Sequence, residues 1–157
     1  MTGKQEFNDL MTDLAADIAG RQLNADLNAY LNDQYGPTTD RYRTIEAVCR
    51  NGVAEGWLAD RQGGAKIKFS RPIKPGPDMQ NFSVDVVEMD DVVGPHHRHP
   101  NGEIDMIIPL DEGAEFDGKG AGWLVYGPDT AHHPTVTGGK AIILYLLPEG
   151  AIEFTKQ

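Results

Sequence analysis

The sequence predicts a mainly β protein, an antiparallel barrel or sandwich, preceded by a short helical segment. Up to residue 52, apolar residues recur at intervals of three and four, as on one face of a helix. From residue 53, about eight short apolar or alternating runs follow, each bounded by Gly, Pro or Asp. No helical pattern interrupts these runs, so only strands are expected there. The chain is therefore divided into a helical segment, 1–52, and a β domain, 53–157.

Three helices are predicted in the first segment. One apolar stripe covers residues 7–19. Asn24 is expected to cap a second helix, because its side chain can accept a hydrogen bond from a free N–H group of the first turn. Thr39 or Asp40 is expected to cap a third helix in the same way. The Asn-Gly pair at 51 and 52 is typical of a helix stop and predicts the end of the third helix.

The β domain begins with a predicted hairpin, in which GVAEGWLAD and AKIKFS are joined by the turn RQGG. RPIKPGPDM is rich in Pro, so it is expected to form a loop or a sheet edge. NFSVDVVEMD alternates, and this predicts Phe82, Val84 and Val86 on one face and the residues between them on the other. Further strands are predicted at EIDMIIPL, GAGWLVYGP, HHPTV and KAIILYLLP.

The charge of the chain restricts its partners. The formal net charge is −10 and no run of Lys or Arg is present, which argues against nucleic acid or an anionic membrane as partner. No apolar stretch approaches the roughly 20 residues of a membrane-spanning helix. Acidic residues interrupt the N-terminal apolar pattern, so no signal peptide is expected. The single Cys49 fits a reducing cytoplasm and is expected to be buried in a helix.

All five histidines lie in two short clusters, and the first is in GPHHRHPNGEID. Side chains two residues apart on a strand share a face, so His97 and His99 point together while His96 and Arg98 point away. The turn that follows returns the chain, and Glu103 opens the next strand. Two imidazoles and a carboxylate at this spacing are a ligand set for a divalent cation such as zinc, ferrous iron or manganese.

The second cluster, in GPDTAHHPT, can supply a fourth ligand from a strand across the barrel. His132 and His133 are adjacent, so they lie on opposite faces and only one of them can point inward. An HxH sequence alone is more often a pair of exposed polar residues. The joint occurrence of both clusters, the first followed by an acid at turn spacing, favours metal binding instead.

These residues resemble the two motifs of the cupins. His97-x-His99-x3-Glu103 is similar to the first motif, and Pro128-x-Thr130-x2-His133 is similar to the second, with Thr130 in the place of a usual Gly. The resemblance implies a small cupin β-barrel over residues 53–157.

The cupin resemblance also implies a divalent metal inside one mouth of the barrel. The change at Thr130 can alter the turn, so His132 stays open as the alternative to His133. The implied metal ligands are His97, His99, Glu103 and His133.

Nearly the whole chain resembles the 4-hydroxylaminobenzoate lyase family of bacterial nitroaromatic degradation. The segments that carry this likeness are IEAVCRNGVAEGW, FSVDVVEMDDVVGPHHRHPNGEID, GAGWLVYGP and AIILYLLPEGAIEF. The resemblance implies a lyase that converts 4-hydroxylaminobenzoate to 3,4-dihydroxybenzoate and ammonia. As a separate hypothesis about the mechanism, a bound metal would act as a Lewis acid on the hydroxylamine oxygen.

Such a reaction needs a proton donor or acceptor and a partner for the substrate carboxylate. Besides Glu103, the candidates for acid–base work are Asp105, which shares the strand parity of Glu103, and Tyr145. A second interpretation of Asp105 is a group that orients a ligand histidine. For Tyr145, the preferred interpretation is core packing with a hydrogen-bonded hydroxyl. The candidates for binding the carboxylate are Arg71 and Lys74, in the Pro-rich stretch, or Lys66 and Lys68, on the strand before it, and Arg71 is preferred.

Two other functions remain compatible with the sequence. Ferrous iron with open positions would suit an oxygenase acting on an aromatic acid. A small-molecule-binding protein without turnover would use the same pocket. By analogy of fold, the chain is expected to form a homodimer.

Overall fold

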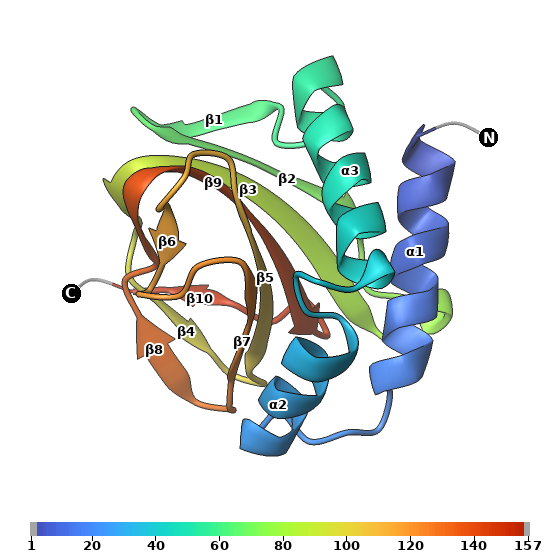
Figure 1. Cartoon of the computed structure of the whole chain (residues 1–157). Helices are drawn as coiled ribbons and strands as arrows, with labels where there is room; N and C mark the ends of the chain where they lie inside the picture. The colour runs from blue at the N-terminus through green and yellow to red at the C-terminus, as the bar shows by residue number, and fades with distance from the viewer. Residues whose placement is uncertain (1–2, 156–157) are drawn as a thin grey trace.

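The computed structural model describes residues 3–155 (Figure 1). Its helices are α1 (Gly3–Ile18), α2 (Ala25–Gln34), α3 (Asp40–Glu55) and a single 3₁₀ turn, η1 (Pro77–Met79). The strands are β1 (Arg61–Gly64), β2 (Ile67–Ile73), β3 (Phe82–Val93), β4 (His97–His99), β5 (Glu103–Pro109), β6 (Glu115–Phe116), β7 (Gly122–Tyr126), β8 (Thr130–His132), β9 (Thr135–Pro148) and β10 (Glu153–Phe154). The predicted mainly β class is confirmed. Among the described residues, no helix has the length and apolar character needed to cross a membrane.

The helices begin where the sequence indicates. The Asn24 side chain accepts a hydrogen bond from Leu27 N at 3.1 Å, and that of Thr39 accepts one from Tyr42 N at 3.2 Å. Of the two candidates for the third cap, Thr39 is therefore the residue that caps α3.

The end of α3 differs from the prediction. The helix passes through the Asn-Gly pair to Glu55 and stops at Gly56, whose φ of 85° is the left-handed conformation of a helix C-cap. The predicted strand over GVAEGWLAD is therefore wrong, and RQGG forms β1 instead of a turn. Gly52 serves packing, because a Cβ atom there would lie 2.5 Å from the Leu58 side chain.

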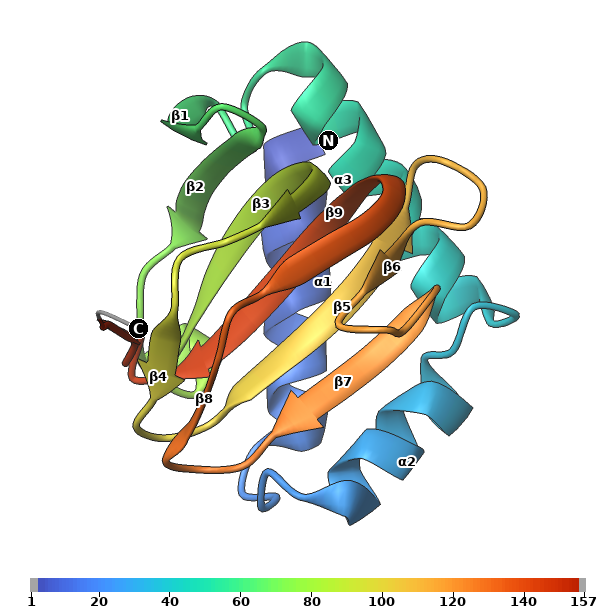
Figure 2. The same cartoon turned by 90° about the vertical axis from the view of Figure 1, so that its left-hand side faces the viewer.

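Two antiparallel sheets form the barrel. The larger has the order β1-β2-β3-β9-β5-β7, with β6 also paired to β9, and the smaller has the order β10-β4-β8. Figure 2 shows β4 and β8 in front of the large sheet and α1 behind it. The helices thus cover the outer face of the large sheet, and the small sheet faces its inner side.

Strand alternation sorts the side chains between these faces. Outer residues such as Val84 and Leu146 pack in one core with helical residues such as Phe7 and Leu31. On the inner face, Tyr145 of β9 pairs with Asp85 of β3 and with Asp105 of β5. Cross-strand partners in antiparallel sheets point to the same side, so this row of polar groups lies inside the barrel.

The α2 helix protects the edge of the large sheet at β7. Asn32 Oδ1 accepts a hydrogen bond from Trp123 N at 2.9 Å, and Asn32 Nδ2 donates one to Trp123 O at 3.0 Å. One turn earlier, Asn28 Oδ1 accepts from Val125 N at 3.0 Å. These side chains replace the missing neighbouring strand, which leaves fewer free backbone groups at the edge.

Replacing Asn32 should therefore destabilise the fold. Asn32→Ala leaves the N–H and C=O of Trp123 without their partners, at an expected cost of about 2 kcal/mol in the free energy of unfolding. The exposed helical Asn51 is the matched control, because Asn51→Ala makes the same change of helix propensity without a sheet contact. Urea unfolding of both variants measures the difference, and equal stabilities would contradict this role.

Candidate active site

Four ionisable side chains meet inside the barrel. His97 and His99 come from β4, Glu103 is the first residue of β5, and His132 is the last residue of β8. One ligand atom from each lies within 4.8 Å of the ligand atoms of the others. The turn between β4 and β5 requires the glycine at 102, where φ is 90° and a Cβ atom would lie 2.7 Å from Tyr126 O.

The four side chains direct their nitrogen and oxygen atoms at one another. Glu103 Oε1 lies 3.4 Å from His97 Nε2 and 3.2 Å from His99 Nε2. His132 Nε2 lies 3.1 Å from His97 Nε2 and 3.7 Å from Glu103 Oε2. Burial alone would raise the pKa of Glu103, but the interactions with these histidines outweigh it and hold the pKa well below its ordinary value.

Several buried polar atoms of this cluster have no hydrogen-bond partner among the described residues. His99 Nε2 and both carboxylate oxygens of Glu103 are buried and have no hydrogen-bond partner. Buried polar atoms in proteins nearly always have one. Converging lone pairs from imidazole and carboxylate suit a divalent cation, so His97, His99, Glu103 and His132 could hold a metal ion.

Outer contacts direct the ligand nitrogens of two histidines toward the cluster. The Thr130 hydroxyl donates to Gly127 O at 2.7 Å, so at its 2.8 Å contact with His99 Nδ1 it accepts the imidazole proton. His132 Nδ1 likewise donates to Asp117 Oδ2 at 2.7 Å. In both residues Nε2 is left to face the cluster, the arrangement common to histidine ligands of metals.

The structure places His132, and not His133, in the cluster. Strand β8 pairs with β4 so that His132 lies opposite His97 and Thr130 lies opposite His99, which puts all four side chains on one face. His133 follows β8, where its Nδ1 lies 3.2 Å from Gly94 O. The second motif predicts His133 as the fourth ligand. The structure corrects this prediction, because His132 is the histidine that lies in the cluster.

Asp117 is a site residue that the sequence analysis missed. Its carboxylate accepts hydrogen bonds from His132 Nδ1, from Tyr126 OH at 2.5 Å and from Thr135 N at 2.9 Å. Burial lowers the pKa of His132, but the hydrogen bond to Asp117 and the nearby negative charge of Glu103 outweigh burial and raise the pKa to about 9. The same negative surroundings favour a cation at the cluster. No spacing in the sequence connects Asp117 with His132.

Asp105 and Tyr145 lie beside the cluster on the inner face, where strand parity predicts Asp105. Asp105 is fully buried and neither carboxyl oxygen has a hydrogen-bond partner. Burial and the adjacent charge of Glu103 raise the pKa of Asp105 well above its ordinary value. Tyr145 is also largely buried, and no hydrogen bond of its hydroxyl is found among the described residues.

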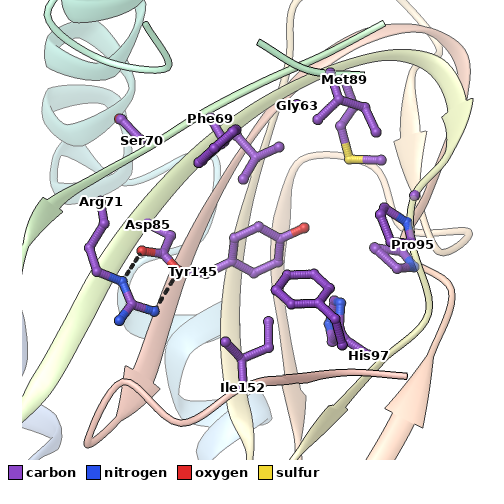
Figure 3. A pocket seen from close by; sticks show the side chains of 15 residues that line it. Gly63, Phe69, Ser70, Arg71, Asp85, Met89, Pro95, His97, Tyr145 and Ile152 are labelled. Atoms are coloured by element: carbon purple, nitrogen blue, oxygen red, sulfur yellow. Dashed lines mark hydrogen bonds and ion pairs between the residues drawn. The ribbon is translucent and has the colours of Figure 1, made fainter. Parts of the chain in front are cut away.

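A pocket of about 360 Å³ opens next to the cluster and is mostly apolar. In Figure 3, Arg71 and Asp85 lie at one end of it, His97 and Pro95 lie at the other, and Tyr145 lies between them. A volume of this size suits a small organic ligand.

Of the predicted cationic residues, the structure brings only Arg71 to this pocket. Arg71 lines it, with Nε 2.6 Å from Asp85 Oδ1 and its second terminal nitrogen 3.1 Å from Oδ2. Lys74 is exposed and does not line the pocket. Arg98 points outward, as predicted, and forms ion pairs with Glu153 and Asp129.

Comparison with known proteins places the chain in a family. Residues 9–154 match the model of the PnbB family, described as 4-hydroxylaminobenzoate lyase. A 4-hydroxylaminobenzoate lyase of Nocardioides sp. (strain LMS-CY) is 35% identical, over 98% of this chain and 96% of that protein. One of Pseudomonas putida is also 35% identical, over 100% of this chain and 98% of that protein.

Among solved structures, an RmlC-like cupin protein from Ralstonia eutropha JMP134 aligns with a TM-score of 0.48 and 11% identity, over 64% of this chain and 66% of that one. The match over almost the full length, to the family and to both relatives, identifies the chain as a member of the 4-hydroxylaminobenzoate lyase family.

Proposed function

We propose that the protein converts 4-hydroxylaminobenzoate to 3,4-dihydroxybenzoate and ammonia in the pocket beside the histidine cluster. The observation that carries this proposal is an apolar pocket with Arg71 at one end and His97 of the cluster at the other. An aromatic ring suits the apolar walls, a carboxylate suits the guanidinium, and the hydroxylamino group would then face the cluster. The names of the two relatives support the same substrate.

The overall reaction consumes one water molecule and needs no external oxidant. The N–O bond and the ring C–N bond break, nitrogen leaves as ammonia, and adjacent ring carbons carry the two hydroxyl groups of the product. Reduction of nitrogen balances oxidation of the ring. Turnover should therefore proceed without molecular oxygen, unlike that of an oxygenase.

In this proposal His97, His99, Glu103 and His132 hold a divalent metal, and zinc, iron or manganese would accept these ligands. When bound, the metal supplies Lewis acidity toward the oxygen of the hydroxylamino group. Glu103 also brings the negative charge that offsets part of the cation's charge.

Two further polar groups beside the cluster are proposed to act on the substrate. The raised pKa of Asp105 makes it a proton donor beside the cluster, where a leaving group needs a proton. The Tyr145 hydroxyl, without a protein partner among the described residues, can bind the substrate.

Arg71 can bind the substrate carboxylate without releasing Asp85. Asp85 and Gly150 O occupy the Nε and one terminal nitrogen of the guanidinium. In the described structure, no hydrogen bond is found to the other terminal nitrogen, so its two N–H groups can receive a carboxylate. Asp85 fixes the orientation of the guanidinium in this arrangement.

The direct test of the proposal is anaerobic incubation of the purified protein with 4-hydroxylaminobenzoate, scored by ammonia and 3,4-dihydroxybenzoate, with metal content measured on the same sample. Wild type should release the two products in equal amounts, and His97→Ala and Glu103→Gln should lose most of the activity. Absence of turnover by metal-loaded protein would exclude this substrate. Turnover that requires oxygen would favour an oxygenase.

His132, the last residue of β8, and His133, which follows it, provide a matched test of the ligand set. His132→Ala should weaken metal binding by more than about 100-fold, since it removes a ligand, whereas His133→Ala should change it by less than about twofold. Asp117→Ala, which removes the acceptor that orients His132, should have an intermediate effect of about 10- to 100-fold.

Competition with a chelator, followed by elemental analysis, measures these affinities, and circular dichroism checks that each variant is folded. Equal effects of the two histidine substitutions, or a larger effect at His133, would contradict the assignment.

Arg71 and Lys74 provide a second matched pair. Arg71→Gln should raise the KM for 4-hydroxylaminobenzoate about 10- to 100-fold, the range expected for a lost charged hydrogen bond, with a smaller change of kcat. Lys74→Gln should leave both constants nearly unchanged. Phenylhydroxylamine lacks the carboxylate, so wild type and Arg71→Gln should act on it with similar kinetic constants. A KM increase that is equal for both substrates would contradict carboxylate binding by Arg71.

A further inference from the structure

Two exposed phenylalanine side chains lie at the pocket. Within the described residues, the exposed large hydrophobic side chains are Phe69, Val93 and Phe154. Phe69 and Phe154 line the pocket, and Val93 does not. Phe154 is 68% exposed. A protein generally keeps such rings from water, so two of them at one pocket indicate a surface for an apolar ligand.

The two rings come from different sheets. Phe69 lies on β2, where it pairs with Val87 on the inner face. Phe154 lies on β10, at the edge of the small sheet. The pocket therefore opens between β2 of the large sheet and β10 of the small sheet, with one phenylalanine on each side.

The position of Phe154 is defined by its neighbours. Phe154 pairs with His97 across β10 and β4, and the centroids of the two rings are 5.8 Å apart at an interplanar angle of 77°. Glu153 is ion-paired with Arg98 at 3.1 Å, and Thr155 N donates to His96 O at 3.0 Å. These contacts hold the last strand against the strand that carries His97 and His99.

We propose that Phe69 and Phe154 are specificity-determining residues that hold the aromatic ring of the substrate between the Arg71 end of the pocket and the histidine cluster. This inference deepens the proposed function and rests on it, because it assigns the ring position in the same pocket. Contacts between aromatic rings distinguish an aromatic acid from a saturated ring of similar size. The C-terminal strand β10 is thus part of the substrate site.

Equilibrium binding tests this role without any turnover. The probes are 4-hydroxybenzoate and trans-4-hydroxycyclohexanecarboxylate, which share a carboxylate and a para hydroxyl but differ in the aromaticity of the ring. Calorimetry on the full-length protein with its metal should show that wild type prefers the aromatic acid by about tenfold or more. Phe154→Ala and Phe69→Ala should each reduce this preference about three- to tenfold, chiefly through weaker binding of the aromatic acid.

Val93→Ala is the matched control, since Val93 is exposed and lies outside the pocket lining. It should leave both affinities unchanged. Equal weakening of the two acids in the phenylalanine variants, no weakening of either, or a wild type without preference would overturn the inference. A changed mass in solution with unchanged binding would overturn it as well, and would assign the two rings to a contact between copies of the chain.

These outcomes are separable from failure of the proposed function. Neither probe contains a hydroxylamino group, so binding is measured whether or not the protein acts on 4-hydroxylaminobenzoate. If the protein does not act on 4-hydroxylaminobenzoate, the phenylalanine variants can still show a reduced preference for aromatic acids.

Discussion

The backbone pairing of β9 with its neighbours is the constraint on which the rest of the structure depends. This 14-residue strand pairs with β3 on one side and with β5 and β6 on the other. A slip of one residue would exchange the two faces of a strand. In the observed register, apolar residues such as Leu144 and Leu146 face the helices, while Tyr145 faces the barrel interior beside Asp85 and Asp105.

The barrel interior also concentrates charge, which has an energetic cost. Removing a carboxylate from water is unfavourable unless opposite charges or hydrogen-bond donors compensate. Asp85 is compensated by Arg71 and Asp117 by three donors, whereas the oxygens of Glu103 and Asp105 have no hydrogen bonds. The uncompensated acids are the ones beside the histidines. Such a cost is typical of a site built for binding and chemistry, where stability is partly given up for function.

Local patterns predicted the parts of the site that neighbouring residues determine. His97, His99 and Glu103 were grouped by strand alternation and one tight turn, and the structure brings them together. The inward position of Asp105 follows from its parity with Glu103 on β5. The caps at Asn24 and Thr39 were equally local.

Long-range register decided the remaining features. Whether His132 or His133 faces inward depends on how β8 pairs with β4, about thirty residues earlier in the chain. Asp117 reaches His132 through the path of a loop, and no periodicity encodes that path. The Asn-Gly pair at 51 and 52 predicts a helix stop, but Gly52 packs closely on Leu58 within α3, which continues to Glu55. Arg71 and Lys74 are near neighbours in sequence, and only the course of β2 separates the pocket residue from the exposed one.

Pairing of β4 with β8 brings His97, His99, Glu103 and His132 together, and we propose that these four residues form one metal site. Anomalous diffraction from crystals of the metal-loaded protein, recorded at the absorption edge of the metal that elemental analysis identifies, tests it directly. We expect one peak about 2.0–2.3 Å from Nε2 of each of the three histidines and from an oxygen of Glu103. A peak coordinated by His133, or no peak at the cluster in protein that carries one metal per chain, would contradict it.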